Sequence, residues 1–532
     1  MTHCCRVPVK SYKRMASTNQ EREELHKTIW AIADQLRGPV GGWEFKAYVL
    51  GSIFYRFISE NISNYINTAQ REAGDPTFDY ADLSDEDAEE AREQMVAEKG
   101  FFILPSQLFQ NVAKHPETDE NLNETLSRIF HSIEASAIGT PSEPDLKGLF
   151  SDFVVDNSQL GNSVGMRNAL IARVLVAVRD MDLGSEFGDS QIDTFGDTYE
   201  YLMQMYAANA GKSGGEFFTP QEVSEVLARI ASYGNSDIKK VYDPACGSGS
   251  LLMKFAKIVG KGQKSLRYYG QEVNPTTYNL CRINMFLHNI NYDKFDIQLG
   301  DTLHEPLHLD EAPFDAIVSN PPYSLKWDGK DNPILINDDR YAPAGVLAPK
   351  SAADLAFTMH MLYHLSETGT AAIVEFPGVL YRGGDEQKIR KYLVNNNYVD
   401  TVIQLPQNLF FGVGIATCII VLKKSCKRDN HVLFIDASNL FVKSGNKNKL
   451  TQENQDAIVQ AYAERKDVQY FCRLVHRADI EANDFNLSVS SYVEQEDTRE
   501  AIDIDAVNAS LVDIVAEVNA LRSQVDAIIA NL

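Results

Sequence analysis

The sequence predicts an α/β protein in which a helical N-terminal region precedes a doubly wound sheet and a single helix ends the chain. After Gly215, short apolar runs alternate with helical patterns, which is typical of parallel strands joined by helices. Before that point apolar residues recur at helical spacing, and near the C-terminus they follow a heptad pattern. At 532 residues and 44% hydrophobic content, the chain can bury a large core spread over several domains.

Charge and cysteine usage narrow the function classes. The formal net charge is −24, whereas a protein that grips DNA by itself usually presents a basic face, so we expect this chain to bind DNA poorly alone. The seven cysteines lack the paired spacing of a metal site or a disulfide framework, which favours a reducing cytoplasm and no bound metal. No run of about 18 apolar residues occurs, so no membrane contact is predicted.

The N-terminal part divides into a leader and a helical domain. Residues 1–20 carry four basic side chains without an apolar segment after them, and we interpret them as a disordered leader or an over-long start before Met15. Residues 21–195 are predicted to be helical. Their apolar residues recur at helical spacing in two runs, Leu25, Ile29, Ile32 and Leu36, then Val49, Ile53, Phe54, Phe57 and Ile58.

Residues 196–490 are predicted to form an α/β catalytic domain. A helix over 197–208 and a glycine-rich linker mark its start. The segment 324–351 is too long for an ordinary connection, and we expect a mobile flap over the site. Seven apolar runs predict strands at 240–243, 266–273, 295–299, 315–319, 371–376, 399–405 and 417–422.

Residues 491–532 are predicted to be a C-terminal helical tail that docks a partner. Its apolar residues alternate by four and three over about four heptads, a pattern that predicts a coiled coil with a helix of this chain or of another. The seam consists of Val507, Leu511, Ile514, Val518, Leu521, Val525, Ile528 and Leu532.

The most informative stretch is an apolar strand end followed by Asn320-Pro321-Pro322-Tyr323. Each proline removes a backbone donor and fixes φ near −65°, so the chain must leave the sheet, at the edge where open parallel sheets bind ligands. The Asn320 side chain and the Pro321 carbonyl offer two acceptors to one amino group, and Tyr323 offers an aromatic face. The loop therefore predicts a site for a planar amine, and a proline-ended strand with a packed tyrosine is the alternative.

A second site is predicted at the turn 243–249, between a strand and a helix. Gly247 and Gly249 allow a sharp bend and a close approach of a ligand to the backbone. Leu252 stands where a dinucleotide motif needs its third glycine, which weakens an NAD interpretation. The Gly-Lys-Ser/Thr of a phosphate-binding loop is missing too, and Asp243 places an acid at the strand end instead.

Carboxylates end three successive predicted strands ahead of Asn320. They are Asp243, Glu272 and Asp301, and their repetition at one sheet edge favours a binding site over a merely structural sheet. Glu272 lies about twenty residues past the glycines, where an acid typically receives the two ribose hydroxyls of a nucleoside.

Taken in order, these motifs resemble those of S-adenosylmethionine-dependent DNA adenine-N6 methyltransferases, specifically the modification subunits of type I restriction-modification systems. The resemblance runs over most of the chain and implies a Rossmann-like methyltransferase sheet. It rests on Gly-Glu-Phe-Phe-Thr-Pro at 215–220, Asp-Pro-Ala-Cys-Gly-Ser-Gly at 243–249, Gln271-Glu272, Gly300-Asp301 and Asn-Pro-Pro-Tyr at 320–323, with support from 378–384, 410–415 and the helical tail.

The resemblance implies a role for each matching residue. Thr219 and the 243–249 turn would hold the methionine portion of S-adenosylmethionine, Glu272 its ribose and Asp301 its adenine ring. Cys246 departs from the family pattern and is interpreted as a packing variant, because no basic partner lies near it in sequence. The implied cofactor-binding residues are Glu216, Phe217, Phe218, Thr219, Asp243, Pro244, Gly247, Ser248, Gly249, Glu272 and Asp301, and the implied catalytic residues are Asn320, Pro321, Pro322 and Tyr323.

The implied reaction is methyl transfer to N6 of an adenine flipped out of DNA. Asn320 and Pro321 would accept the N6 hydrogens and localise the nitrogen lone pair, and the base would stack on Tyr323 with Phe410 or Phe411 on its other side. Two alternatives stay open. The same loop fits a protein glutamine or an RNA amine, and the chain could be a scaffold that only binds the cofactor.

The resemblance also implies partners, namely a specificity subunit, a second modification subunit, a restriction subunit and double-stranded DNA held through the complex. Beyond Leu422 the sequence shows no basic, aromatic-bearing domain able to read base edges, so we expect another chain to recognise the DNA sequence.

Overall fold

The computed structural model describes residues 45–183, 194–203, 219–260, 265–410, 414–425, 427, 429–496 and 504–530. The chain forms two compact units, residues 1–493 and residues 494–532. The predicted leader, the helix expected over Leu25 to Leu36 and the glycine-rich linker lie outside the described residues. The predicted boundary between residues 195 and 196 falls inside the first unit.

The N-terminal region is helical, as predicted. Its core is aromatic: Phe130 stacks on Phe150 with ring centroids 4.2 Å apart, and Phe54 packs on Phe150 at 5.5 Å. The last long helix begins after Ser163, whose hydroxyl accepts a hydrogen bond from the Met166 amide and so caps the helix. The helices are α2 (Phe45–Glu72), α3 (Asp85–Ala88), α4 (Arg92–Lys99), α5 (Phe109–Val112), α6 (Leu122–Ala135), α7 (Glu143–Leu146) and α8 (Val164–Arg179).

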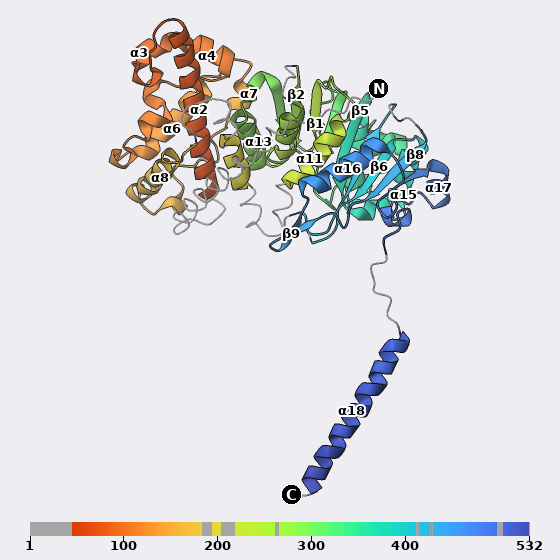
Figure 1. The fold of residues 1–532 in the computed structure, drawn as a ribbon. Helices are drawn as coiled ribbons and strands as arrows, with labels where there is room; N and C mark the ends of the chain where they lie inside the picture. Colours follow the sequence, from red (N-terminus) through yellow and green to blue (C-terminus); the bar gives the residue numbers. More distant parts are fainter. Residues whose placement is uncertain are drawn as a thin grey trace. The chain divides into compact units, whose positions relative to one another are not determined.

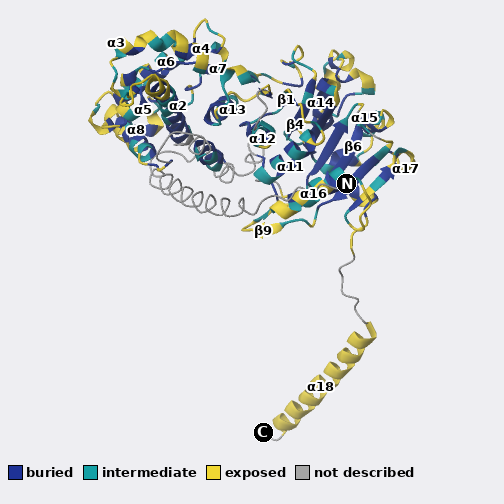
Figure 2. Ribbon diagram, turned by 45° about the horizontal axis from the view of Figure 1, so that its top comes forward, coloured by how far each residue is buried: buried dark blue, intermediate teal, exposed yellow. Residues whose placement is uncertain are grey.

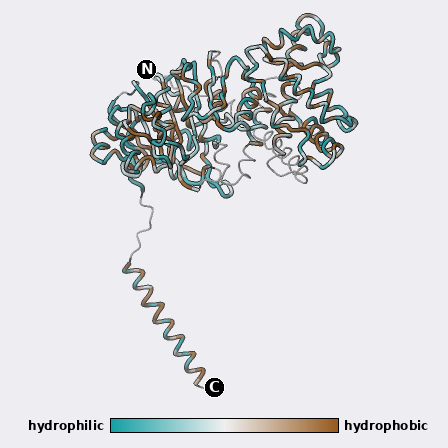
Figure 3. The backbone as a smooth tube through the Cα atoms, turned by 180° about the vertical axis from the view of Figure 1, so that it is seen from behind, coloured by the Kyte–Doolittle hydropathy of each residue, from teal (hydrophilic) through white to brown (hydrophobic). Residues whose placement is uncertain are grey.

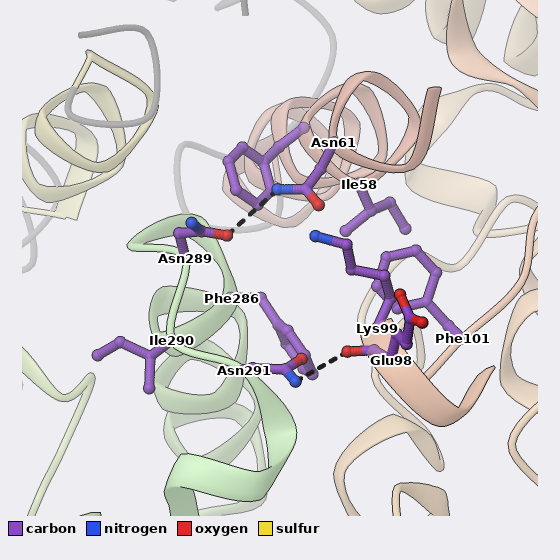
Figure 4. Close-up of a pocket in the computed structure, with 10 residues that line it drawn as sticks. Ile58, Asn61, Glu98, Lys99, Phe101, Phe286, Asn289, Ile290 and Asn291 are labelled. Atoms are coloured by element: carbon purple, nitrogen blue, oxygen red, sulfur yellow. Dashed lines mark hydrogen bonds between the residues drawn. The ribbon is translucent and has the colours of Figure 1, made fainter. Parts of the chain in front are cut away.

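Helices α2 and α4 meet the end of α13 (Pro275–Leu287), a helix of the α/β region. Asn61 Nδ2 donates to Asn289 Oδ1 at 3.3 Å, and Asn291 Nδ2 donates to the Glu98 carbonyl at 2.9 Å (Figure 4). A cavity of about 220 Å³ lies between these contacts. They attach the helical region to the helix that follows the strand of Glu272.

The α/β region is built on a nine-stranded sheet of order β11-β8-β6-β7-β5-β4-β1-β2-β3 (Figure 1). Strands β1 to β6 and β8 run in one direction, and β7 and β11 run against them. This is the doubly wound architecture that the sequence predicts. The strands are β1 (Lys240–Asp243), β2 (Arg267–Glu272), β3 (Phe295–Leu299), β4 (Phe314–Ser319), β5 (Leu365–Glu375), β6 (Val399–Gln404), β7 (Cys418–Lys423), β8 (His431–Asp436) and β11 (Cys472–His476).

Alternate residues of the central strands enter two different cores. Val241 and Val318 belong to the first core, whereas Tyr242 and Ile317 belong to the second, because successive side chains of a strand point to opposite faces. Figure 2 shows the central strands buried between helices. The first face is covered by α11 (Gln221–Ser232), α12 (Ser250–Phe255), α13 and α16 (Gln452–Glu464), and the second by α14 (Asp354–His364), α15 (Asp385–Asn395) and α17 (Arg477–Ala482).

The strand order reverses between β1 and β4. From β1 the chain continues to β2 and β3 on one side, then crosses to β4 and β5 on the other. The loops after β1 and β4 therefore diverge and leave room for a ligand at the carboxyl edge of the sheet. Asp243 ends β1 and Asn320 follows β4, so the two predicted sites lie at this reversal.

The segment 324–351, which we expected to be a mobile flap over the site, is folded against the sheet. It contains short 3-10 helices at Gly329–Asp331, Leu335–Asn337 and Ala342–Ala344. Trp327 and Tyr341 are buried in the second core, and the Trp327 indole donates to the Pro349 carbonyl at 3.0 Å. Its few aromatic side chains thus anchor a stretch whose composition resembles that of a loop.

The second unit is a helix, α18 (Ile504–Ala530), as the heptad pattern predicts. Its side chains are exposed along its whole length, and hydrophobic and hydrophilic residues alternate along it (Figure 3). Leu532, the last residue of the predicted seam, lies outside the described residues. No described helix of the chain is both long enough and apolar enough to span a membrane.

Candidate functional site

Asn320 follows β4 directly, and its side chain joins two other predicted residues. Its Nδ2 donates to Thr219 Oγ1 at 3.1 Å, and its Oδ1 accepts from the Tyr323 hydroxyl at 2.6 Å. Pro321 is buried and Pro322 is half-buried, which holds the loop against the sheet. The structure therefore brings the predicted catalytic loop and Thr219 together.

The Tyr323 ring is supported from the side by Phe410. The ring centroids lie 6.2 Å apart at an interplanar angle of 80°, and Phe410 is buried. This edge-to-face contact helps to fix the plane of the Tyr323 ring. Burial raises the pKa of the Tyr323 phenol well above its usual value, so the hydroxyl stays protonated and donates to Asn320. Phe411 lies outside the described residues.

The glycine turn has the backbone that its sequence predicts. Gly247 and Gly249 have φ values of 54° and 81°, a region that favours glycine. A Cβ atom at Gly249 would lie 2.8 Å from Cys281 Sγ, so the turn is also closely packed. Ser248 is buried and its carbonyl accepts from Asn284 Nδ2 at 2.9 Å.

Cys246 is a packing residue in the structure as well. It is buried, and a hydrogen bond with Cys281 together with burial raises the pKa of its thiol well above the usual value. A protonated, buried thiol is not a nucleophile.

Asp243 is fully buried at the end of β1. Its Oδ1 accepts from the Ala245 amide at 3.0 Å and from Ser319 Oγ at 2.8 Å. Its Oδ2 is also buried and has no hydrogen-bond partner among the described residues. Burial raises the pKa of this carboxyl to about 7, although the two hydrogen bonds oppose the shift. A buried acceptor without a donor is costly, which suits a site that receives a cation.

Glu272 ties the loops after β1 and β2 together. Its Oε2 accepts from the Gly247 amide at 3.0 Å, and its Oε1 accepts from the Asn274 amide at 2.8 Å. Burial raises the pKa of this carboxyl. A carboxylate has about four acceptor positions, so Glu272 can accept further hydrogen bonds beside those from the chain's own amides.

Asp301 follows β3 and faces the segment 324–351. Its Oδ1 accepts from the Leu303 amide at 2.9 Å, and its Oδ2 lies 2.8 Å from His304 Nδ1. His304 Nε2 in turn lies 3.2 Å from Asp328 Oδ2. Next to Asp301 in the chain, Thr302 Oγ1 donates to the Pro244 carbonyl. This hydrogen bond connects the loop after β3 to the glycine turn.

Sequence reasoning missed three side chains that position the loop. Ser319 connects β4 to Asp243, and Asp354 accepts the Ser324 amide with both carboxylate oxygens at 3.1 and 3.2 Å. Glu375 ends β5 in full burial, where burial and the Asp354 charge raise the pKa of its carboxyl well above the usual value. A polar residue in an apolar run was a signal for Ser319 and for Glu375, which lies within the predicted strand 371–376, but not for Asp354. Glu216, Phe217 and Phe218 lie outside the described residues.

Known families match both regions of the chain. A model described as N-6 DNA Methylase matches residues 190–501, and one described as HsdM N-terminal domain matches residues 25–178. Over 528 residues the chain is 47% identical to the methylase subunit of the type I restriction enzyme MpnII of Mycoplasma pneumoniae, covering 96% of this chain and 97% of that one. The chain belongs to the N-6 DNA methylase subunits of type I restriction enzymes. Membership in this family confirms the resemblance that the sequence motifs indicated, the methyltransferase fold and the adenine-specific DNA methyltransferase class.

Solved structures of the family share the fold of this N-6 DNA methylase. The methyltransferase subunit of a type I restriction-modification system from Streptococcus thermophilus is 33% identical to this chain and has a TM-score of 0.80. The match covers 89% of this chain and 100% of that one. A chain from a structure that addresses complex assembly of a type I system shares the fold with a TM-score of 0.61 at 19% identity over 96% of this chain.

Proposed function

We propose that this N-6 DNA methylase transfers a methyl group from S-adenosylmethionine to N6 of an adenine flipped out of double-stranded DNA, as the modification subunit of a type I complex. One observation carries the proposal. Ser319 binds the buried Asp243 carboxylate and stands next to Asn320, so the candidate cofactor site and the candidate base-binding loop lie side by side at the carboxyl ends of the neighbouring strands β1 and β4. A methyl donor and an adenine amino group held at these two strand ends would react directly, without a covalent enzyme intermediate.

The residues present fit the cofactor. The free oxygen of Asp243 would accept from the ammonium group of the methionine portion, and the glycine turn gives that portion close access to the backbone. Glu272 would accept the ribose hydroxyls, and Asp301 would contact the adenine ring. The cofactor supplies a methyl group that is already strongly electrophilic, so this chain needs to orient and activate the acceptor nitrogen.

The acceptor loop would activate the adenine amino group by hydrogen bonding. That nitrogen is a poor nucleophile because its lone pair is delocalised into the ring. Asn320 Oδ1 and the Pro321 carbonyl would accept its two hydrogens and so localise the lone pair. The Thr219 hydroxyl fixes the Asn320 amide, because it accepts from Nδ2 and leaves Oδ1 as the acceptor. The flipped base would stack on Tyr323, whose plane Phe410 holds.

The partners follow from the assignment to a type I complex. We assign a specificity subunit, a second modification subunit and a restriction subunit, with DNA held by the whole assembly in the cytoplasm. Residues 21–195 would form the helical domain, residues 196–490 the catalytic domain and residues 491–532 the docking tail. The net charge of −24 supports the assignment, because a partner then provides the basic surface for DNA.

The test is tritium transfer from labelled S-adenosylmethionine to a DNA duplex by the chain assembled with its specificity partner. We expect label in N6-methyladenine at one defined sequence, and none with the isolated chain. Label in protein glutamine or RNA, or cofactor binding without any transfer, would instead support one of the two alternatives.

The affinity for S-adenosylmethionine should depend on pH through Asp243. With a pKa of about 7, this carboxyl is mostly protonated at pH 5.5 and half ionised at pH 7, and only the ionised form attracts an ammonium group. The affinity should therefore rise about tenfold from pH 5.5 to pH 7, a range in which an α-amino group stays protonated. The contribution of Asp243 to the free energy of unfolding should show the opposite trend. Its carboxyl has a lower pKa in the unfolded chain and loses its proton there first, so stability falls as the pH rises from about 4 to about 7.

Isothermal titration at several pH values measures the affinity, with Asp243→Asn as the matched variant. The variant should bind weakly and without this pH dependence, and its melting temperature shows whether it is folded. A pH-independent affinity of the wild-type chain would remove Asp243 from the cofactor site.

A further inference from the structure

A small hairpin lies at the same sheet edge as the catalytic loop. Strand β8 ends at Asp436 at this edge, and the chain then forms the antiparallel strands β9 (Val442–Ser444) and β10 (Lys447–Lys449) (Figure 1). Gly445, with φ of 61°, opens the two-residue turn between them. The hairpin is separate from the nine-stranded sheet, and residues 442–446 are exposed.

The charge of the hairpin is opposite to that of the chain. Residues 437–452 contain three lysines and no acidic residue, whereas the whole chain has 74 acidic and 50 basic residues. Both lysines are exposed: Lys443 is the middle residue of β9 and pairs in register with Asn448, and Lys449 is the last residue of β10 and pairs with Val442, so the two side chains project from opposite faces of the hairpin. An exposed pair of cations on an acidic protein attracts a polyanion to that place and not to the rest of the surface.

The hairpin is attached to the loop that leads to Phe410, beside the proposed site of the flipped base. The Asn448 amide donates to the Asn408 carbonyl at 3.1 Å, and Asn448 Nδ2 donates to the Gln407 carbonyl at 2.8 Å. This loop follows β6 and leads to Phe410, whose ring contacts Tyr323. A continuous chain of contacts thus runs from the basic hairpin to the residue on which the flipped base would stack.

We infer that the β9–β10 hairpin grips the phosphate backbone of the DNA strand beside the flipped adenine, with Lys443 and Lys449 as the phosphate ligands. The inference rests on the proposed function and adds the element of this chain that holds the DNA over the pocket. Phosphates are the occupant because the hairpin combines exposed ammonium groups with backbone and asparagine donors, and Val442 is its one exposed large apolar side chain, too little for the apolar core of a protein interface. It contributes affinity and position, and no sequence selectivity.

The test uses the enzyme assembled with its specificity partner and the variant Lys443→Ala/Lys449→Ala. We expect the KM for a target duplex at about 0.1 M salt to rise roughly tenfold or more, with kcat and cofactor affinity nearly unchanged. The slope of log affinity against log salt should become shallower by about 2, since each lost phosphate contact removes about 0.9. Lys443→Arg/Lys449→Arg keeps both charges and should behave like the wild type.

The matched control is Lys239→Ala/Lys294→Ala. Lys239 is exposed just before β1 and Lys294 is partly exposed just before β3, at the opposite edge of the sheet. The control therefore removes the same charge away from the proposed site and should leave the KM and the salt slope unchanged. An unchanged KM in the hairpin variant, an equal effect in the control, or loss of assembly with the specificity partner would overturn the inference. Absence of DNA methylation by the wild-type assembly would instead refute the proposed function.

Discussion

Replacing Asn320 by alanine should lower the rate of DNA methylation at least a hundredfold while the affinity for S-adenosylmethionine stays within about twofold of the wild type. The change removes the side-chain acceptor for the adenine amino group, and loss of one preorganised group of this kind costs about 3 kcal/mol in the transition state. The proposed cofactor contacts come from the carboxyl ends of β1, β2 and β3, where Asp243 and Glu272 end their strands and Asp301 follows the third. Single-turnover tritium transfer and isothermal titration measure the two quantities.

Two further variants make this result specific. Asn337→Ala removes an exposed asparagine from the neighbouring segment and should retain full activity. Tyr323→Phe removes the hydroxyl that donates to Asn320 Oδ1 but keeps the aromatic face, so it should retain most of the activity if that face holds the base. Wild-type turnover in Asn320→Ala would show that the loop is only a proline-ended strand with a packed tyrosine.

Removing the chain after Glu496 should abolish assembly with the specificity subunit and site-specific methylation while cofactor binding survives. The deleted part belongs to a separate compact unit, and α18 exposes its heptad seam: Leu511, Ile514 and Leu521 are 54%, 56% and 54% exposed. A stripe of this length on an isolated helix is typical of a surface that a second helix covers. Size-exclusion chromatography of the mixed subunits and methylation of a target duplex measure the outcome.

Point variants separate the seam from the helix itself. Ile514→Asp/Leu521→Asp places two charges on the seam and should weaken assembly more than a hundredfold, because buried unpaired carboxylates cost several kcal/mol. Ala516→Asp/Ser523→Asp adds the same charges, two residues further along and off the seam, and should assemble normally. Equal behaviour of the two variants, or complex formation by the truncated chain, would mean that α18 is not the docking element.

The sequence by itself determined the fold class, the order of the motifs and the heptad helix. Period-two and period-four apolar patterns are local, so β1, β4, β6 and β7 appear within one or two residues of the predicted runs. The glycines of the turn need positive φ, and the prolines after Asn320 end a strand wherever they stand. These constraints act between neighbours in the chain, so they can be predicted from the sequence without knowledge of the tertiary structure.

Local patterns misjudged elements whose signal lies in their surroundings. Strand β5 begins at Leu365, six residues before the predicted run, because Ser366 and Glu367 are polar and partly exposed at the sheet end. Strands β8 and β11 lie beyond the last predicted apolar run at 417–422 and were not predicted. The segment 324–351 has the composition of a loop, yet Trp327 and Tyr341 are buried in a core that only the assembled sheet provides.

Only the tertiary structure decided which residues meet at the site. Thr219 reaches Asn320 across about a hundred residues, Ser319 reaches Asp243, and Asn448 links the basic hairpin to the loop of Phe410. These contacts depend on β1 and β4 being neighbours and on β6 and β8 ending at the same edge, which no periodicity specifies. The physical reason is that a strand pattern fixes which face of the sheet a side chain occupies, whereas the packing of the whole sheet fixes which strand lies next to which.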